Sequence, residues 1–177
     1  MKVAIITDQH FGARKNSKLF HDYFLKFYEE VFFPSLEAEG ITTVIDMGDT
    51  FDSRKGIDFS ALAWAKDHYY DRLKEMGVQV HTIIGNHTAY YKNTNDLTGV
   101  GLFLREYDNV KIYPEAEEVR LDKTKFLRRL ALTRCLTTTI PLTETTIRTI
   151  IASKMLSIVN CGTDESCYYY GSTLRCP

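Results

Sequence analysis

The chain has 177 residues, a formal net charge of -1 and 44% hydrophobic residues. This length and composition suit one globular domain with a closed core. The charge excludes a broadly basic surface that would bind nucleic acid by itself. No apolar run approaches the roughly 18 residues of a membrane span, and the chain starts with a strand pattern instead of a signal peptide. We therefore expect a cytoplasmic protein without membrane contact.

Strand and helix patterns alternate along the first two thirds of the chain. Apolar runs predict strands at 2–7, 43–47, 79–84 and 110–113. Apolar residues at helical spacing predict helices at about 19–39, from Ser60 to Met76, and at about 97–106. Gly40 is the expected C-terminal cap of the first helix, and Ser60 the N-cap of the second. This alternation predicts an α/β fold with a mostly parallel sheet and right-handed crossovers.

Aromatic and histidine residues outside the strand ends have an ordinary structural explanation. The first helix carries an aromatic stripe made of Phe20, Tyr23, Phe24, Phe27 and Tyr28. Packing in the core and between helices is its expected role, with a dimer or partner surface as the alternative. Three histidines follow no strand end, so we expect them to be common helix or strand residues; they are His21, His68 and His81.

The composition changes near Lys125. Residues 126–177 contain all four cysteines but no histidine. The cysteine spacing matches no zinc site, so we expect free thiols in a reducing cytosol. Helical spacing recurs within 126–160, but threonine runs weaken it, and we expect an irregular or helical C-terminal tail. This atypical tail is either a genuine short form or a frameshifted or disordered segment, and the composition favours a reading-frame change.

Three polar clusters directly follow three of the predicted strands. They are Asp8-Gln9-His10, Gly48-Asp49-Thr50-Phe51-Asp52 and Gly85-Asn86-His87. The carboxyl ends of parallel strands meet at one edge of a sheet, so these side chains should converge there. Carboxylates suit Mg²⁺ or Mn²⁺, and imidazole suits transition metals. The set predicts the divalent metal centre of a hydrolase, although a turn or helix-cap role explains any single aspartate equally well.

The motif order Asp-x-His, Gly-Asp-x-x-Asp and Gly-Asn-His resembles the calcineurin-like metallophosphoesterases. Residues next to the motifs narrow the resemblance to the SbcD-type DNA repair nucleases, and most closely to the recombination endonuclease subunits of T4-like phages. These neighbouring residues are Ser53-Arg54-Lys55, His81 to Ile84 and Tyr91-Lys92-Asn93. The resemblance covers about residues 1–125. It implies the N-terminal half of a layered α/β metallophosphoesterase domain, and the host cytoplasm as location if a phage encodes the chain.

This resemblance assigns a role to each motif residue. It implies two divalent ions, with Mn²⁺ expected and Mg²⁺ as the alternative. Asp8 and His10 would hold the first ion, Asp49 would bridge both, and Asn86 would bind the second. His87 would be the catalytic residue that orients or protonates the leaving group. Asp52 would orient a ligand through a hydrogen bond, as metal ligands commonly require, although a cap role is its alternative.

The resemblance also implies a substrate and a partner. It indicates an exonuclease or endonuclease subunit for DNA recombination and double-strand-break repair, which acts with an SbcC-type ATPase subunit and could form a homodimer. Basic residues after the first two motifs could contact DNA phosphates, although solvated surface charge explains any one of them equally simply. They are Arg14, Lys15, Arg54 and Lys55.

Two departures from the family pattern affect the expected activity. Thr88 stands where the family has an acidic residue after Gly-Asn-His, and no histidine follows His87, whereas the family completes its site with later histidines. A second ion held by Asp49 and Asn86 alone would bind weakly. We therefore expect impaired activity unless another chain supplies ligands. An inactive fragment that only binds a partner, and a phosphoesterase for a small phosphoester, remain as alternative functions.

Overall fold

The computed structural model describes residues 1–53, 55–85, 88–91 and 96–114, and short strands in the rest of the chain. These later strands are β5 (Glu117–Leu121), β6 (Thr124–Arg128), β7 (Thr137–Ile140), β8 (Leu156–Asn160), β9 (Cys167–Tyr170) and β10 (Thr173–Arg175). Strands β5 and β6 pair with each other, and β10, β9 and β7 form a separate antiparallel sheet.

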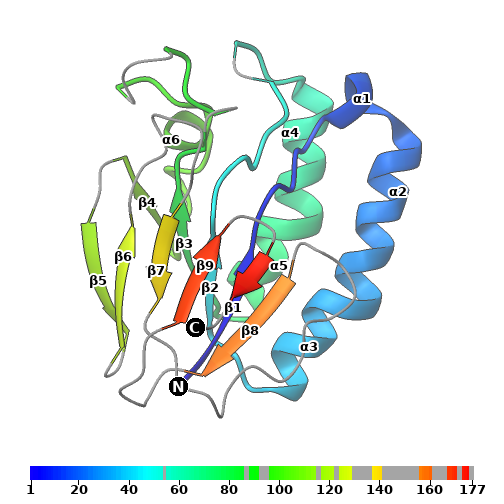
Figure 1. Ribbon diagram of the computed structural model, residues 1–177. Helices are drawn as coiled ribbons and strands as arrows, with labels where there is room; N and C mark the ends of the chain where they lie inside the picture. Colours follow the sequence, from blue (N-terminus) through cyan, green and yellow to red (C-terminus); the bar gives the residue numbers. More distant parts are fainter. Residues whose placement is uncertain are drawn as a thin grey trace.

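The main sheet has the strand order β4-β3-β2-β1-β8 (Figure 1). Its four parallel strands are β1 (Lys2–Ile6), β2 (Thr43–Asp46), β3 (Gln79–Ile83) and β4 (Val110–Tyr113). Strand β8 runs antiparallel to β1. Every residue of β2 and the last four of β1 are buried, as is typical of parallel strands. The predicted α/β class with a mostly parallel sheet is confirmed.

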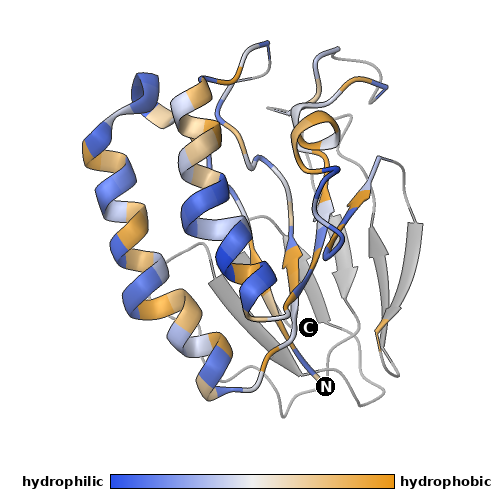
Figure 2. Ribbon diagram, turned by 180° about the vertical axis from the view of Figure 1, so that it is seen from behind, coloured by the Kyte–Doolittle hydropathy of each residue, from blue (hydrophilic) through white to orange (hydrophobic). Residues whose placement is uncertain are grey.

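Two long helical stretches cover one face of this sheet (Figures 1 and 2). The first consists of α2 (Lys18–Phe27), the π-helical turn η1 (Tyr28–Phe32) and α3 (Phe33–Ala38). The second consists of α4 (Phe59–Ala65), the π-helical turn η2 (Lys66–Tyr70) and α5 (Asp71–Glu75). The short helices α1 (Ala13–Asn16) and α6 (Gly99–Phe103) lie in the connections after β1 and β3.

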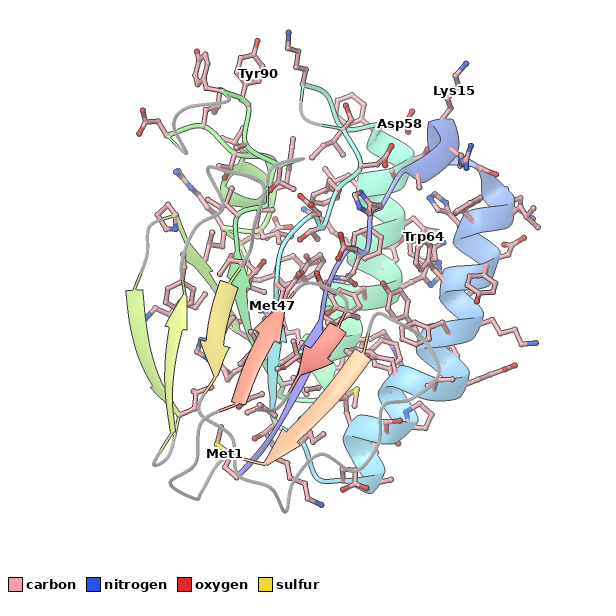
Figure 3. The ribbon with its side chains drawn as sticks, viewed as in Figure 1. Met1, Lys15, Met47, Asp58, Trp64 and Tyr90 are labelled. Atoms are coloured by element: carbon pink, nitrogen blue, oxygen red, sulfur yellow. The ribbon has the colours of Figure 1, made fainter. Side chains whose placement is uncertain are left out.

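Aromatic side chains fill the space between the helices and the sheet. The ring centroid of Phe11 lies 5.9 Å from those of Phe51 and Trp64, and 5.8 Å from that of Tyr69. Trp64 reaches from α4 toward α2, where it stacks on His21 (Figure 3). Tilted ring pairs at these distances add to the stabilisation from burial. Because Phe11 and Phe51 belong to the first two motif loops, the core anchors both loops.

Helix ends differ from the predicted ones for local reasons. Asp58 caps α4 in place of the predicted Ser60, because its carboxylate accepts a hydrogen bond from Ser60 N at 2.8 Å, and aspartate is as good an N-cap as serine. The predicted helix at 97–106 shortens to α6, whose two glycines are weak helix formers. The cap predicted at Gly40 is confirmed by its left-handed backbone, with φ of +59°.

The described parts of the tail are strands, which corrects the expected irregular or helical segment there. Residues 124–128, 137–140 and 156–160 are all extended. Threonine and other β-branched residues favour strands over helices, and β7 has the sequence Thr-Thr-Thr-Ile. The other residues of the predicted helical stretches lie outside the described residues. None of the helices in the described part of the chain has the length and apolar character that a bilayer crossing requires.

Candidate metal centre

The first two motif loops run side by side beyond the ends of β1 and β2. The backbone N–H of Asp8 donates to the carbonyl of Gly48 at 3.2 Å, and that of His10 to the carbonyl of Asp49 at 3.0 Å. The N–H of Phe11 continues the series with the carbonyl of Thr50 at 2.8 Å. These bonds extend the parallel pairing past the sheet edge, so the backbone itself holds the two motifs together.

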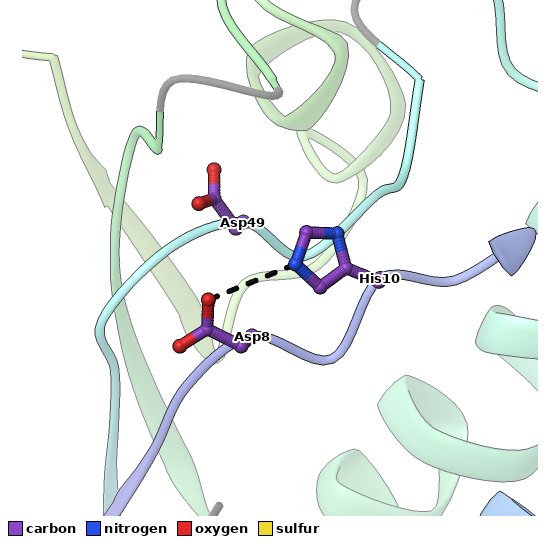
Figure 4. A group of neighbouring side chains, drawn as sticks. All are labelled: Asp8, His10 and Asp49. Carbon is purple, nitrogen blue, oxygen red and sulfur yellow. Dashed lines mark ion pairs between the residues drawn. The ribbon is translucent and has the colours of Figure 1, made fainter. Parts of the chain in front are cut away.

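Asp8, His10 and Asp49 form a compact cluster at this edge (Figure 4). Each offers one ligand atom, and these atoms all lie within 4.8 Å of one another. His10 Nε2 is 3.7 Å from Asp8 Oδ1. Asp8 is exposed and the other two are half-buried. Two carboxylates and an imidazole form a donor set that divalent transition metals accept, so the residues present fit one such ion.

The surroundings of His10 are strongly acidic. Its Nδ1 lies 3.5 Å from Asp52 Oδ1, on the other side of the ring from Asp8. The nearby carboxylate of Asp8 raises the pKa of His10 above its usual value, against the opposing effect of burial, and the charge of Asp49 adds to the increase. Asp52 thus lies beside the His10 ring, and its role as an orienting partner stays a prediction. The same concentration of negative charge would attract a cation.

All three cluster residues have left-handed backbone conformations. Their φ angles are +55° for Asp8, +47° for His10 and +53° for Asp49. This region is uncommon for residues other than glycine, although aspartate and histidine enter it more readily than most. Such conformations cost of order 1–3 kcal/mol each and concentrate at functional sites. The sequence patterns give no signal for this strain.

The third motif loop packs directly against the second. A Cβ atom added to Gly85 would lie 2.2 Å from Asp49 N, and one added to Gly48 would lie 2.9 Å from Gly85 N. Only glycines at both positions allow this approach. Thr88, which replaces the family's acidic residue, is buried and donates its hydroxyl to the carbonyl of Gly85 at 3.0 Å. It thus stabilises the loop and offers no carboxylate.

Several predicted site residues lie outside the described residues, and others are separate from the cluster. Asn86, His87 and Arg54 belong to the first group, so their roles stay predictions. Lys55 is exposed beyond the second motif. Arg14 and Lys15 are exposed on α1, and both line a hollow of about 560 Å³ that also reaches Asp8 and His10. Figure 3 shows Lys15 at the end of the molecule that carries Asp58 and Tyr90.

One buried carboxylate, which lies beneath the loops, was not among the residues predicted for the site. Asp46, the last residue of β2, accepts hydrogen bonds from Gly48 N and Gln9 Nε2 at 3.0 Å and from Thr50 Oγ1 at 3.1 Å. Gln9 Oε1 in turn accepts a bond from Tyr28 OH at 2.6 Å. Burial raises the pKa of Asp46 to about 7, although these hydrogen bonds oppose the increase. An aspartate within an apolar strand run is the sequence signal that points to it.

The histidines predicted to be ordinary lie in packing contacts. His68 packs against Trp64 with ring centroids 5.0 Å apart. His81 Nδ1 is 2.8 Å from the hydroxyl of Tyr113, within β3 and β4. His21 stacks on Trp64 at 4.7 Å. Each of these side chains therefore has a structural contact that accounts for it.

Comparison with known proteins agrees with this geometry. The family model described as calcineurin-like phosphoesterase matches residues 1–144. Exonuclease subunit 1 of Enterobacteria phage T4 is 31% identical over 122 residues, which are 69% of this chain and 35% of that relative. The chain thus spans about a third of the length of the curated relative that it matches. With a family match over most of its residues, the chain belongs to the calcineurin-like phosphoesterase family.

Proposed function

We propose that this chain is a metal-dependent phosphodiesterase that acts on DNA, as a nuclease subunit in recombination and double-strand-break repair. The observation that carries the proposal is the cluster of Asp8, His10 and Asp49, whose ligand atoms lie within 4.8 Å of one another at the carboxyl edge of a parallel sheet. The name of the T4 relative, an exonuclease subunit, supports both the DNA substrate and an assembly with a second subunit. An SbcC-type ATPase is the proposed partner.

The motif residues would divide the work of holding a metal. Asp8 and His10 would bind the first ion, and Asp49 would bridge to the second, with Asn86 as a further ligand and His87 as the acid for the leaving group. Asp52 would keep the His10 ring in place from its opposite side. Paired divalent ions supply two effects when bound: they lower the pKa of water and neutralise charge on the phosphoryl oxygens. Mn²⁺ is the proposed ion, with Mg²⁺ as the alternative, because carboxylates together with an imidazole fit a divalent transition metal.

We propose that these residues support only weak catalysis by themselves. Thr88 has no carboxylate to offer, and its hydroxyl donates to the carbonyl of Gly85 within the loop. The sequence has no histidine after His87 that could complete the shell of the second ion. We therefore expect one ion to bind more tightly than the other, and DNA cleavage to rise when another chain supplies ligands.

The test combines metal binding with substrate digestion. Mn²⁺ titration calorimetry compares the wild type with Asp49→Asn and with Asp22→Asn, a matched control on the outer side of α2. Asparagine tolerates the left-handed conformation of Asp49, so the variant removes a charge without forcing the backbone to change. We expect Asp49→Asn to weaken Mn²⁺ binding by more than about tenfold and Asp22→Asn to leave it unchanged.

Digestion of three substrates then separates the candidate functions. Cleavage of single- or double-stranded DNA that depends on Mn²⁺ and on Asp49 supports the nuclease. Turnover of a small chromogenic diester without DNA cleavage favours a phosphoesterase for small substrates. Absence of both Mn²⁺ binding and activity would leave the inactive fragment or partner-binding remnant as the better account.

A further inference from the structure

An open hollow of about 560 Å³ lies beside the candidate metal cluster. Its size falls within the range of small-molecule binding sites. Its lining joins residues of both motif loops to residues of α1 and α2; they are Asp8, His10, Asp52, Ala13, Arg14, Lys15, Phe20 and Phe24. The hollow therefore connects a metal site, two cations and an aromatic wall in one space.

The two rings of the aromatic wall, Phe20 and Phe24, differ in their exposure to solvent. Phe24 is buried and belongs to the core, but Phe20, one turn earlier on α2, is 37% exposed. Both line the hollow. More than a third of Phe20 is thus left uncovered by the fold. It offers a stacking face, and nucleobases bind such faces without sequence preference.

The rim of the hollow carries acidic groups on one side and basic groups on the other. Asp8, His10 and Asp52 lie on the metal side, whereas Arg14 and Lys15 supply two positive charges from α1. A phosphate held by metal ions would thus lie next to cations that could bind the adjacent phosphates. A nucleotide chain presents this same sequence of groups, with a base attached to each phosphate through its sugar.

We propose that the hollow is a base-binding subsite. It takes the unpaired nucleobase next to the scissile phosphate, with Phe20 as the stacking platform and with Arg14 and Lys15 bound to neighbouring phosphates. The inference rests on the proposed function and narrows its substrate to a single strand or a frayed DNA end. Bases within a duplex are stacked and paired, so their ring faces are closed to Phe20 until the strands separate.

Binding of a single-stranded oligonucleotide tests this subsite directly. The probe carries 2-aminopurine, whose fluorescence falls on stacking, at its terminal position, and phosphorothioate linkages slow its cleavage. The full chain is compared with Phe20→Ala, Phe20→Tyr and Tyr23→Ala. Tyr23 is the matched control, because it lies on the same helix, is 71% exposed and does not line the hollow.

We expect the wild type, Phe20→Tyr and Tyr23→Ala to quench the probe and bind it equally well. Phe20→Ala should lose the quenching and raise the Kd about five- to hundredfold, the usual effect of removing a stacking residue. The same variant should raise KM for the oligonucleotide, because the terminal base loses its stacking partner, whereas Tyr23→Ala should leave this KM unchanged.

Other outcomes overturn the inference. Equal quenching and affinity in Phe20→Ala, or a wild type that does not bind the probe, would exclude the subsite while Mn²⁺ binding and diester hydrolysis could still support the proposed function. A change in sedimentation for both Phe20→Ala and Tyr23→Ala, with unchanged oligonucleotide affinity, would assign this face of α2 to a protein partner. Loss of Mn²⁺ binding and diester hydrolysis in the wild type would instead refute the proposed function itself.

Discussion

Replacing Asp46 with asparagine should remove a strong pH dependence of folding stability. Asp46 is fully buried and has no cationic partner among its hydrogen-bonding groups, which are a backbone N–H, the amide of Gln9 and the hydroxyl of Thr50. Burial raises its pKa from 3.8 to about 7 in the folded protein. In the unfolded chain the same carboxyl has an ordinary value near 3.9. The folded state therefore binds this proton more tightly than the unfolded state does.

The sign of the effect follows from this difference. Below about pH 4 both states are protonated at this site, and the contribution of Asp46 to the free energy of unfolding is at its highest. Between about pH 4 and 7 only the folded state keeps the proton, so stability falls as the pH rises. With each pKa unit worth 1.36 kcal/mol, the shift to about 7 corresponds to a total loss of about 4 kcal/mol. Above pH 7 no further loss comes from Asp46.

Asp46→Asn cannot ionise and so avoids this loss. Rotation of the Gln9 amide would let its oxygen accept from the new Asn NH₂ group, while its nitrogen would donate to the hydroxyl of Tyr28. Urea unfolding followed by Trp64 fluorescence, from pH 5 to pH 8, gives the difference between variant and wild type. The variant should gain relative stability as the pH rises and be the more stable protein at pH 8.

The control for this prediction is Asp58→Asn. Asp58 is an exposed helix cap whose hydrogen bonds with Ser60 lower its pKa, so its contribution to stability is lost only in more acidic solution and stays constant from pH 5 to pH 8. A difference between Asp46→Asn and wild type that does not vary with pH would refute the reasoning, because it would mean that the buried carboxyl titrates alike in both states.

Three further substitutions test the packing and the ligand support around the cluster. Gly85→Ala should weaken Mn²⁺ binding and destabilise the fold, because its Cβ would lie 2.2 Å from the backbone of the second motif. Gly56→Ala is the control, since its Cβ would have nothing within 4 Å. Calorimetry and urea titration should show unchanged metal affinity and unchanged stability for this control. Phe51→Ala should lower the unfolding free energy by about 3–5 kcal/mol. Phe59→Ala, at a site that is 85% exposed, should lower it by less than about 0.5 kcal/mol. Equal losses in the two variants would contradict the assignment of Phe51 to the core. Asp52→Asn should reduce Mn²⁺ affinity about tenfold to hundredfold, and unchanged affinity would show that this carboxylate does not support His10.

The strands and the ligand cluster follow from local sequence signals. Apolar residues dominate β1, β2 and β3, and a polar motif directly follows each of these strands. Parallel pairing then requires neighbouring motifs to meet at one edge. The ends of β1 and β2 therefore place Asp8 and Asp49 together without any knowledge of their side-chain contacts. The two long helical stretches were also predictable, because their apolar residues recur at helical spacing and Gly40 ends the first one.

What the sequence could not predict depends on contacts between distant segments. The packing of Gly85 on Asp49 joins residues from different loops, and nothing in either local pattern indicates a distance. The bonds from Gln9 and Thr50 to Asp46 likewise join three segments. The cap at Asp58 was missed for a different reason. Two candidates of similar strength, Asp58 and Ser60, lie two positions apart at one helix end, and their hydrogen-bond geometry decides between them.

The residue types of the cluster suit its backbone conformation as well as the proposed metal. Asp8, His10 and Asp49 all lie near φ of +50°, a region that aspartate and histidine enter more readily than most side chains. The Asp46 network lies directly beneath and binds Gly48 N, next to Asp49, and the side chain of Gln9, between Asp8 and His10. It thereby stabilises the strained loops from below, with no direct role toward a ligand. Substituting asparagine for aspartate in the cluster is thus the sharper probe of metal binding, because alanine would add backbone strain to the loss of a ligand.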